Sequence, residues 1–232
     1  YETTELGTGE FVDQVKDLAV SADGIAWAVT PNSVAAFDGS AWRFWEEGQG
    51  FDDTIFFEAI TVDAEGRPWV AYGSGVQTFD GTTWTAVEAA DLSQVQSIAV
   101  DAGGRVWAGT YSKGVSAWDG STWKTYTRET STLPSDNVKA LAVDAAGRVW
   151  IGTEWGMAVA DGDVWAAYHM HTSGLLDNEV VAIAVSGAGP TLPALSETQP
   201  GALTGTIVRD GAPLADAFVE ACVEFIGSSF IG

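Results

Sequence analysis

The chain has 232 residues, which is enough for one or two domains with a sizeable buried core. It carries 10 Lys and Arg against 32 Asp and Glu, so its formal net charge is −22, and such an acidic surface repels phosphate backbones and anionic lipid head groups. Nucleic acid is therefore excluded as an expected partner, and no apolar run long enough for membrane insertion occurs. With 46% hydrophobic residues, 27 Gly and 11 Trp, the composition indicates a globular, turn-rich protein.

A tryptophan three residues after a turn glycine recurs along the chain at intervals of about 40 residues. The four glycines are Gly24, Gly66, Gly104 and Gly147, and the four tryptophans are Trp27, Trp69, Trp107 and Trp150. An Asp-Gly pair follows each tryptophan in phase, at 38–39, 80–81, 119–120 and 161–162, with a second tryptophan three residues after each glycine. The constant phase favours packing between repeats over a sugar-binding ladder as the role of these tryptophans.

Each repeat divides into four short strands. An apolar first strand, at 15–20, 59–62, 95–100 or 138–143, ends in a turn at the glycine, and the second strand carries the first tryptophan. The Asp-Gly pair predicts a hairpin between the third and fourth strands. Four antiparallel strands in a repeat of this length predict an all-β protein built of β-propeller blades.

The repeat resembles the two-component regulator propeller repeats, which occur in sensor regions of hybrid histidine kinases and in secreted proteins. The unit from Asn137 to Tyr168 matches the pattern best, and the resemblance covers residues 1–189. It implies four full blades with structural, non-catalytic signature residues. A fifth unit begins at 179–185, so we expect a closing innermost strand there, completed by strands of a longer natural protein; the alternative is a self-contained five-bladed ring.

The pattern stops after Gly189, and the proline-containing stretch 190–200 is expected to be a linker. Residues 201–232 resemble the start of a carboxypeptidase regulatory-like domain, which implies a partial β-sandwich segment. Cys222, the single cysteine, lies in this segment, and we expect it either buried or paired with a cysteine beyond Gly232, with pairing favoured.

The blade-to-blade loops and the turns between second and third strands are expected on one face, the usual ligand face of propellers. Aromatic side chains beside carboxylates, amides and imidazoles suit a glycan or a cationic group on a protein partner. The alternative is ordinary solvated loop tips. The candidate residues are Trp45, Phe51, Asp52, Tyr111, Glu154, Trp155, His169, His171, Asp177 and Asn178.

No cofactor and no metal site are expected. His169 and His171 with Asp177 are a weak metal pattern, and calcium at the Asp-containing turns (Asp23, Asp63, Asp101 and Asp144) is less favoured than aspartates that cap their own turns. The sequence also lacks G-x-S-x-G, H-E-x-x-H, phosphate-loop and dinucleotide motifs.

The favoured function is a secreted, non-catalytic recognition or scaffold propeller that binds a glycan or an extracellular protein. The acidic charge and the two resemblances indicate an extracellular or periplasmic location. One alternative is the sensor propeller of a two-component signalling receptor. Another is a polysaccharide lyase or glycosidase in which Glu154, His169 and Asp177 act as general acid or base.

Overall fold

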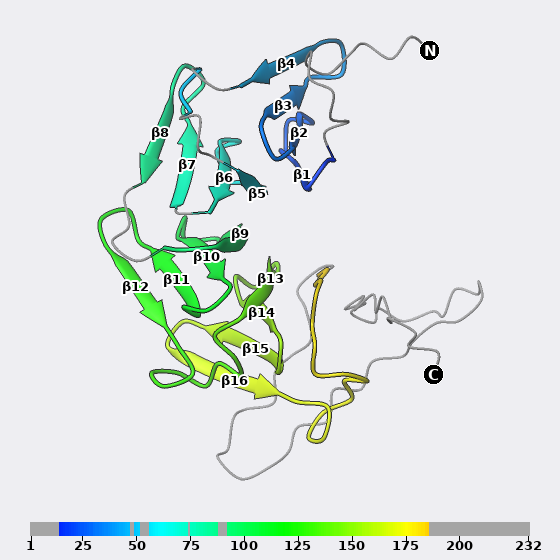
Figure 1. Ribbon diagram of the computed structural model, residues 1–232, viewed down its shortest axis with the longest axis vertical. Coiled ribbons are helices and arrows are strands. Elements are labelled where there is room, and N and C mark those ends of the chain that lie inside the picture. The colour runs from blue at the N-terminus through cyan, green and yellow to red at the C-terminus, as the bar shows by residue number, and fades with distance from the viewer. Residues whose placement is uncertain (1–13, 47–48, 52–55, 74, 88–91, 186–232) are drawn as a thin grey trace, which may run out of the picture.

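The computed structural model describes residues 14–46, 49–51, 56–73, 75–87 and 92–185. These residues form sixteen strands and no helix, and the strands make four sheets of four antiparallel strands each. Figure 1 shows the sheets following one another along an arc, so we number them blade 1 to blade 4 in chain order. No membrane-spanning helix occurs in this described part of the chain. The predicted four blades of an all-β propeller are confirmed.

Every blade has the same strand order, from an innermost first strand to an outermost fourth strand. The strands of blades 1 and 2 are β1 (Asp17–Val20), β2 (Ala26–Val29), β3 (Val34–Phe37), β4 (Trp42–Trp45), β5 (Phe57–Val62), β6 (Pro68–Tyr72), β7 (Gly75–Phe79) and β8 (Trp84–Val87). Those of blades 3 and 4 are β9 (Val95–Val100), β10 (Val106–Thr110), β11 (Val115–Trp118), β12 (Trp123–Tyr126), β13 (Val138–Val143), β14 (Val149–Thr153), β15 (Gly156–Asp161) and β16 (Val164–Tyr168).

The recurring tryptophan occupies the same register position in each blade. In blade 4, Trp150 on β14 stands opposite Ala142 on β13 and Val159 on β15. Small neighbours leave room for the ring, and strand alternation directs it to the face that meets the following segment. The exposed fractions of Trp27, Trp69, Trp107 and Trp150 are 5%, 7%, 1% and 2%. The glycine three residues earlier has φ between +79° and +87° in all four blades, as that turn requires.

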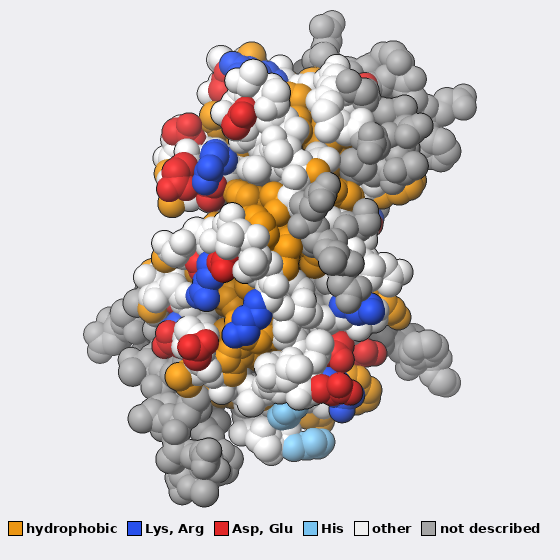
Figure 2. Space-filling view, turned by 90° about the vertical axis from the view of Figure 1, so that its left-hand side faces the viewer, with side chains coloured by type: hydrophobic (Ala, Val, Ile, Leu, Met, Phe, Trp, Pro, Cys, Tyr) orange, Lys and Arg blue, Asp and Glu red, His pale blue; other side chains and the backbone are white. Residues whose placement is uncertain are grey.

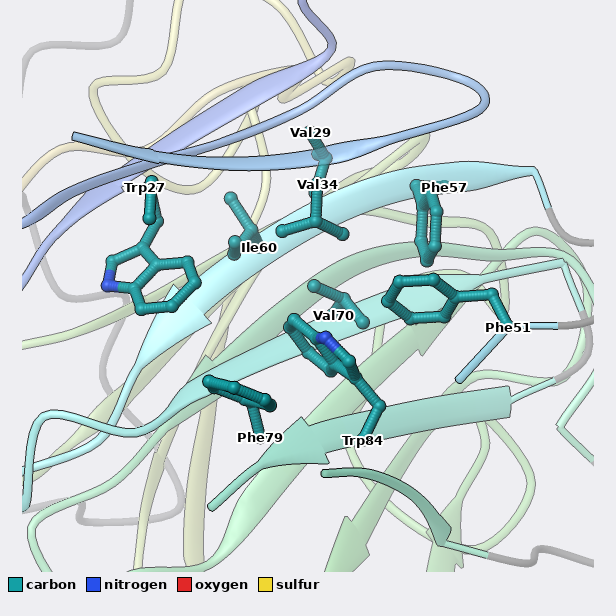
Figure 3. Packing of buried hydrophobic residues seen from close by; sticks show 10 residues of the cluster. Trp27, Val29, Val34, Phe51, Phe57, Ile60, Val70, Phe79 and Trp84 are labelled. Atoms are coloured by element: carbon teal, nitrogen blue, oxygen red, sulfur yellow. The ribbon is translucent and has the colours of Figure 1, made fainter. Parts of the chain in front are cut away.

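The hydrophobic core lies in the seams between neighbouring blades. The innermost strands β1, β5, β9 and β13 run next to one another on the concave side of the arc. Between blades 1 and 2, Trp27 of β2 belongs to the same hydrophobic cluster as Ile60, Phe79 and Trp84 of the second blade (Figure 3). On the outer edge, hydrophobic side chains appear in bands between charged groups (Figure 2). Each fully buried large side chain contributes about 1.5–3 kcal/mol, so the seams join the blades into one body.

The segment 179–185 occupies the place expected for a fifth innermost strand, but the prediction that it forms a strand is wrong for the described residues. Val180 is fully buried against Trp150 and Tyr168, and its N–H donates to the Thr153 carbonyl at 2.9 Å. Only Ala184 has bridge pairing. An innermost strand pairs with the second strand of its own blade, and in this repeat that strand would follow Gly189. The linker at 190–200, the sandwich segment at 201–232 and Cys222 lie outside the described residues.

Candidate functional site

One aspartate organises the turn between the first and second strands in blades 2, 3 and 4. In blade 4, Asp144 Oδ1 accepts hydrogen bonds from the backbone N–H groups of Ala146 and Arg148, both at 3.0 Å. Its Oδ2 accepts from Arg148 Nε at 2.7 Å and from the Trp150 indole N–H at 2.9 Å. We call this set the Asp–Arg–Trp clamp. The equivalent clamps are Asp63, Arg67 and Trp69, and Asp101, Arg105 and Trp107.

The carboxylates of the clamp accept hydrogen bonds from the chain's own donors. Burial, the largest influence on Asp144, works to raise its pKa, but the bonds from Trp150 and Arg148 outweigh it and the pKa is lowered. The same balance lowers the pKa of Asp101. These carboxylates cap their own turns, the reading favoured over calcium binding. Asp23 takes no equivalent position, because Ser21 stands where the other blades have the aspartate.

The Asp-Gly hairpins at the outer edge use a second set of aspartates. Asp38 Oδ1 accepts from the Ser40 hydroxyl at 2.7 Å and from the N–H groups of Ser40 and Ala41 at 2.9 Å. The Ser40 hydroxyl is the largest of these influences, and together they lower the pKa of Asp38 to about 2. In blade 3, hydrogen bonds led by the Thr122 N–H lower the pKa of Asp119 to about 2. Both carboxylates are therefore anionic at neutral pH.

Backbone hydrogen bonds join the turns between second and third strands to the blade-to-blade loops, so both lie on one face, which we call the loop face. The Glu154 N–H donates to the Asn137 carbonyl at 3.2 Å, and the Tyr111 N–H donates to the Gln94 carbonyl at 3.0 Å. Between blades 1 and 2 the roles are exchanged, because the Phe57 N–H at the start of β5 donates to the carbonyl of Pro31 in the turn between β2 and β3, at 3.0 Å. The loops of adjacent blades are thereby held in fixed relative positions, as a recognition surface requires.

Two aromatic side chains stand out from the loop face at corresponding turns. Tyr111 of blade 3 is 51% exposed and Trp155 of blade 4 is 58% exposed. Each turn is fastened by a buried threonine of the preceding strand: Thr110 Oγ1 donates to the Gly114 carbonyl at 2.9 Å and Thr153 Oγ1 to the Gly156 carbonyl at 2.7 Å. The rings are therefore exposed from a rigid base.

Beside Trp155, the loop from β16 to residue 180 supplies polar groups. His169 Nδ1 makes a hydrogen bond of 2.9 Å with the Trp155 carbonyl oxygen, and Asn178 Oδ1 accepts from the Met170 N–H at 2.9 Å. Glu154 Oε2 accepts from the Asn137 amide at 3.4 Å. His171 and Asp177 are exposed in the same loop. Figure 2 shows the histidine side chains together at the end of the arc that carries blade 4.

Two candidate residues belong to the core and not to the exposed loop face. Phe51 is 6% exposed and packs on Phe57 and Trp84, with ring centroids 4.8 and 5.0 Å away. Trp45 is half-buried and stacks on Trp27 at 5.5 Å. The expected position on the exposed loop face is wrong for both rings, because each packs in the seam between blades 1 and 2. Asp52 lies outside the described residues.

The enzyme alternative placed Glu154, His169 and Asp177 in acid–base roles. Each side chain bonds to a different group. Glu154 accepts from the Asn137 amide, His169 bonds to the Trp155 carbonyl, and Asp177 accepts from the Glu179 N–H. Among the described residues, no recorded hydrogen bond joins any two of the three side chains. No group of three or more His, Cys, Asp or Glu side chains there could hold a metal ion.

Sequence reasoning missed the bonds that orient these groups. Asn137 and Asp136 fix the loop of blade 3: Asp136 Oδ1 accepts from the Arg128 N–H at 2.8 Å, just as Asn178 accepts from Met170 in blade 4. The signal was present, because Asp136 and Asn178 occupy the same place in successive repeats. The clamp was likewise visible as an Asp six residues before the tryptophan and an Arg two before it.

The fold and the two faces define a segment of β-propeller with a rigid turn face and an aromatic loop face. A family model described as two component regulator propeller matches residues 132–155, within blade 4 and the loop before it. No curated protein sequence matches the chain.

Solved structures share the fold at low identity. The extracellular domain of the putative hybrid two component system BT3049 from B. thetaiotaomicron has a TM-score of 0.60 and 20% identity, over 74% of this chain and 24% of that chain. PorZ, a bacterial surface component of the type-IX secretion system of Porphyromonas gingivalis, has a TM-score of 0.58 and 19% identity, over 78% of this chain and 31% of that chain. Virginiamycin B lyase from Staphylococcus aureus has a TM-score of 0.58 and 9% identity, over 67% of this chain and 55% of that chain. The chain thus spans a quarter to about half of these proteins.

Proposed function

We propose that the chain is part of an extracellular, non-catalytic recognition propeller that binds a glycan or a protein partner through the loop face of blades 3 and 4. The observation that carries the proposal is the pair of exposed rings, Tyr111 and Trp155, standing at corresponding turns of adjacent blades. Exposed aromatics with fixed polar neighbours are the groups that sugars and protein hot spots use. The fold's likeness to an extracellular sensor domain and to a surface component supports the location.

A sensor role in a two-component receptor is the second candidate. It is supported by the family match at 132–155 and by the fold shared with extracellular domains of hybrid two component systems. In that role the same loop face would receive the signal. The lyase or glycosidase alternative is less favoured, since Glu154, His169 and Asp177 each bond to a different group and not to one another. The fold shared with virginiamycin B lyase does not by itself carry that activity.

The proposal is tested by applying the 232-residue chain to an array of defined glycans and to an array of extracellular proteins. Trp155→Ala is expected to lower the signal of the best-bound probe at least tenfold. Trp42→Ala removes an equally exposed ring from β4, far from the loop face, and is expected to leave binding unchanged. Binding that survives Trp155→Ala and Tyr111→Ala together refutes the site. Product release from a bound glycan establishes the lyase or glycosidase reading in its place.

A further inference from the structure

Blade 1 departs from the clamp of the other three blades. Its recurring tryptophan, Trp27, is retained, but Ser21 replaces the aspartate and Ile25 replaces the arginine. Ser21 Oγ instead bonds to Asp23 and to the backbone of Ile25. The Trp27 indole N–H is buried without a hydrogen-bond partner, whereas the other three indoles donate to their clamp aspartates. The repeat has lost both groups that normally contact this ring.

A pocket of about 290 Å³ lies beside Trp27, in the seam between blades 1 and 2 and among the turns opposite the loop face. Its aromatic lining is Trp27, Trp45 and Phe79. Trp45 stacks on Trp27, and Phe79 meets Trp45 edge-on at 5.1 Å. Figure 3 shows Trp27 and Phe79 at one end of the hydrophobic cluster, with the indole nitrogen of Trp27 on the side away from the other labelled residues.

The molecule itself shows which group this position accepts. In blade 3, Arg105 Cζ lies 5.3 Å from the Trp107 ring centroid, and in blade 4, Arg148 Cζ lies 5.6 Å from that of Trp150. A guanidinium over an indole face is attracted by the ring quadrupole. Ile25, at the corresponding place in blade 1, supplies no cation. Ile25 packs against the cluster that contains Trp27, so blade 1 lacks the guanidinium that blades 3 and 4 place beside the equivalent ring.

The charged residues around the pocket favour a cation. Asp38, Glu65 and Asp80 line it, against Arg43 and Arg67. Arg67 is engaged by its clamp aspartate at 2.8 Å and by Glu65 at 3.4 Å. Hydrogen bonds lower the pKa of Asp38 to about 2 and lower that of Asp80, so both remain anionic at neutral pH. The net charge of −22 adds a long-range attraction for basic partners.

We propose that this pocket binds the guanidinium group of an arginine side chain presented by a partner protein or peptide. The planar guanidinium stacks on the Trp27 and Trp45 pair and meets the carboxylates at the rim, with Asp38 Oδ2 and Glu65 as acceptors. The planar guanidinium of arginine can stack on an aromatic ring and donate several hydrogen bonds, so it suits this site better than the compact ammonium of lysine. The site is separate from the loop face, so it stands or falls independently of the proposed function.

The test titrates the 232-residue chain with N-acetyl-arginine methylamide and follows the tryptophan indole signals by NMR. N-acetyl-citrulline methylamide, a neutral isostere, is expected to bind at least tenfold more weakly, and the lysine analogue severalfold more weakly. The decisive variant is Ser21→Asp with Ile25→Arg, which rebuilds the clamp of blades 2–4 and fills the pocket with the chain's own guanidinium. It is expected to abolish binding of the arginine probe without lowering the urea midpoint.

A second variant and a control guard against a folding defect. Glu65→Gln, at an exposed position, is expected to weaken arginine binding severalfold, and Trp155→Ala on the loop face is expected to leave it unchanged. Equal binding of arginine and citrulline, full binding by the Ser21→Asp/Ile25→Arg variant, or the absence of saturable shifts at the Trp27 indole overturns the proposal.

Discussion

The three clamps differ in one respect that predicts a gradient of stability. The clamp aspartates are all buried, but the arginine side chain is 7% exposed at Arg148, 39% at Arg105 and 50% at Arg67. Replacing the aspartate by asparagine keeps the shape of the side chain. It places an NH2 group, which donates hydrogen bonds, where the Oδ2 acceptor was. Each substitution removes the same hydrogen-bond acceptor from the tryptophan indole. The difference in free energy of unfolding between the three variants therefore measures how much each arginine loses.

For Asp144→Asn the buried guanidinium of Arg148 loses the Asp144 carboxylate, and breaking such a buried pair costs about 3–5 kcal/mol. For Asp63→Asn the half-exposed Arg67 turns into water, and the remaining loss is one buried N–H acceptor, about 1–3 kcal/mol. Asp101→Asn falls between the two. With a urea m-value of about 1–3 kcal/mol per molar, a difference of about 2 kcal/mol separates the midpoints by roughly 1 M.

The assay is urea unfolding followed by tryptophan fluorescence and far-UV circular dichroism, with coincident curves required before free energies are compared. Asp119→Asn, in an exposed outer hairpin where asparagine also caps the turn, is the matched control and is expected to leave the midpoint unchanged. Equal losses in the three clamp variants, or a loss below about 1 kcal/mol for Asp144→Asn, would show that arginine burial does not govern the clamp.

Three further outcomes follow from the described residues. By carboxyl NMR, Asp38 titrates with a midpoint of about 2, and Ser40→Ala raises it by removing the largest influence; an unchanged midpoint contradicts this reading. The stability that separates the wild type from Asp144→Asn is present above the ordinary aspartate pKa of 3.8 and is lost as pH falls through the lowered folded-state pKa, because protonation removes the ion pair; a gap that widens in acid is the contrary result. Gly109→Ala places a Cβ 2.5 Å from Val138 Cγ1 and is expected to cost about 1–3 kcal/mol in urea unfolding, whereas Gly73→Ala, in open space, stays within about 0.5 kcal/mol; equal losses would exclude crowding.

The blade architecture was predictable because the repeat states it four times. A turn glycine, a tryptophan three residues later and an Asp-Gly pair recur in phase, and any one copy could be read as coincidence where four cannot. The prediction of a strand at 179–185 was wrong because a strand forms only when a neighbouring strand hydrogen-bonds to it. Its own apolar residues place it correctly against Trp150, but they cannot supply the ladder partner.

The ligand face was predicted less well because exposure depends on the neighbouring blade. Trp45 and Phe51 precede or lie in a loop, as Trp155 does, and nothing local distinguishes them. Blade 2 decides the matter by offering Phe57 and Trp84 as packing partners in the seam. No large ring of a following blade covers Trp155 among the described residues, so it remains exposed.

The same repeat that makes the fold predictable also makes its exceptions informative. Blades 2, 3 and 4 show that Asp, Arg and Trp are used together, so a blade that retains the tryptophan while losing both partners leaves a buried N–H unsatisfied, at a cost of about 1–3 kcal/mol. Restoring the aspartate by Ser21→Asp alone should recover part of that cost, because the carboxylate can reach the Trp27 indole. If it does, the present sequence of blade 1 keeps a stability deficit beside an aromatic, acid-lined pocket. Deficits of this kind concentrate at sites that bind ligands.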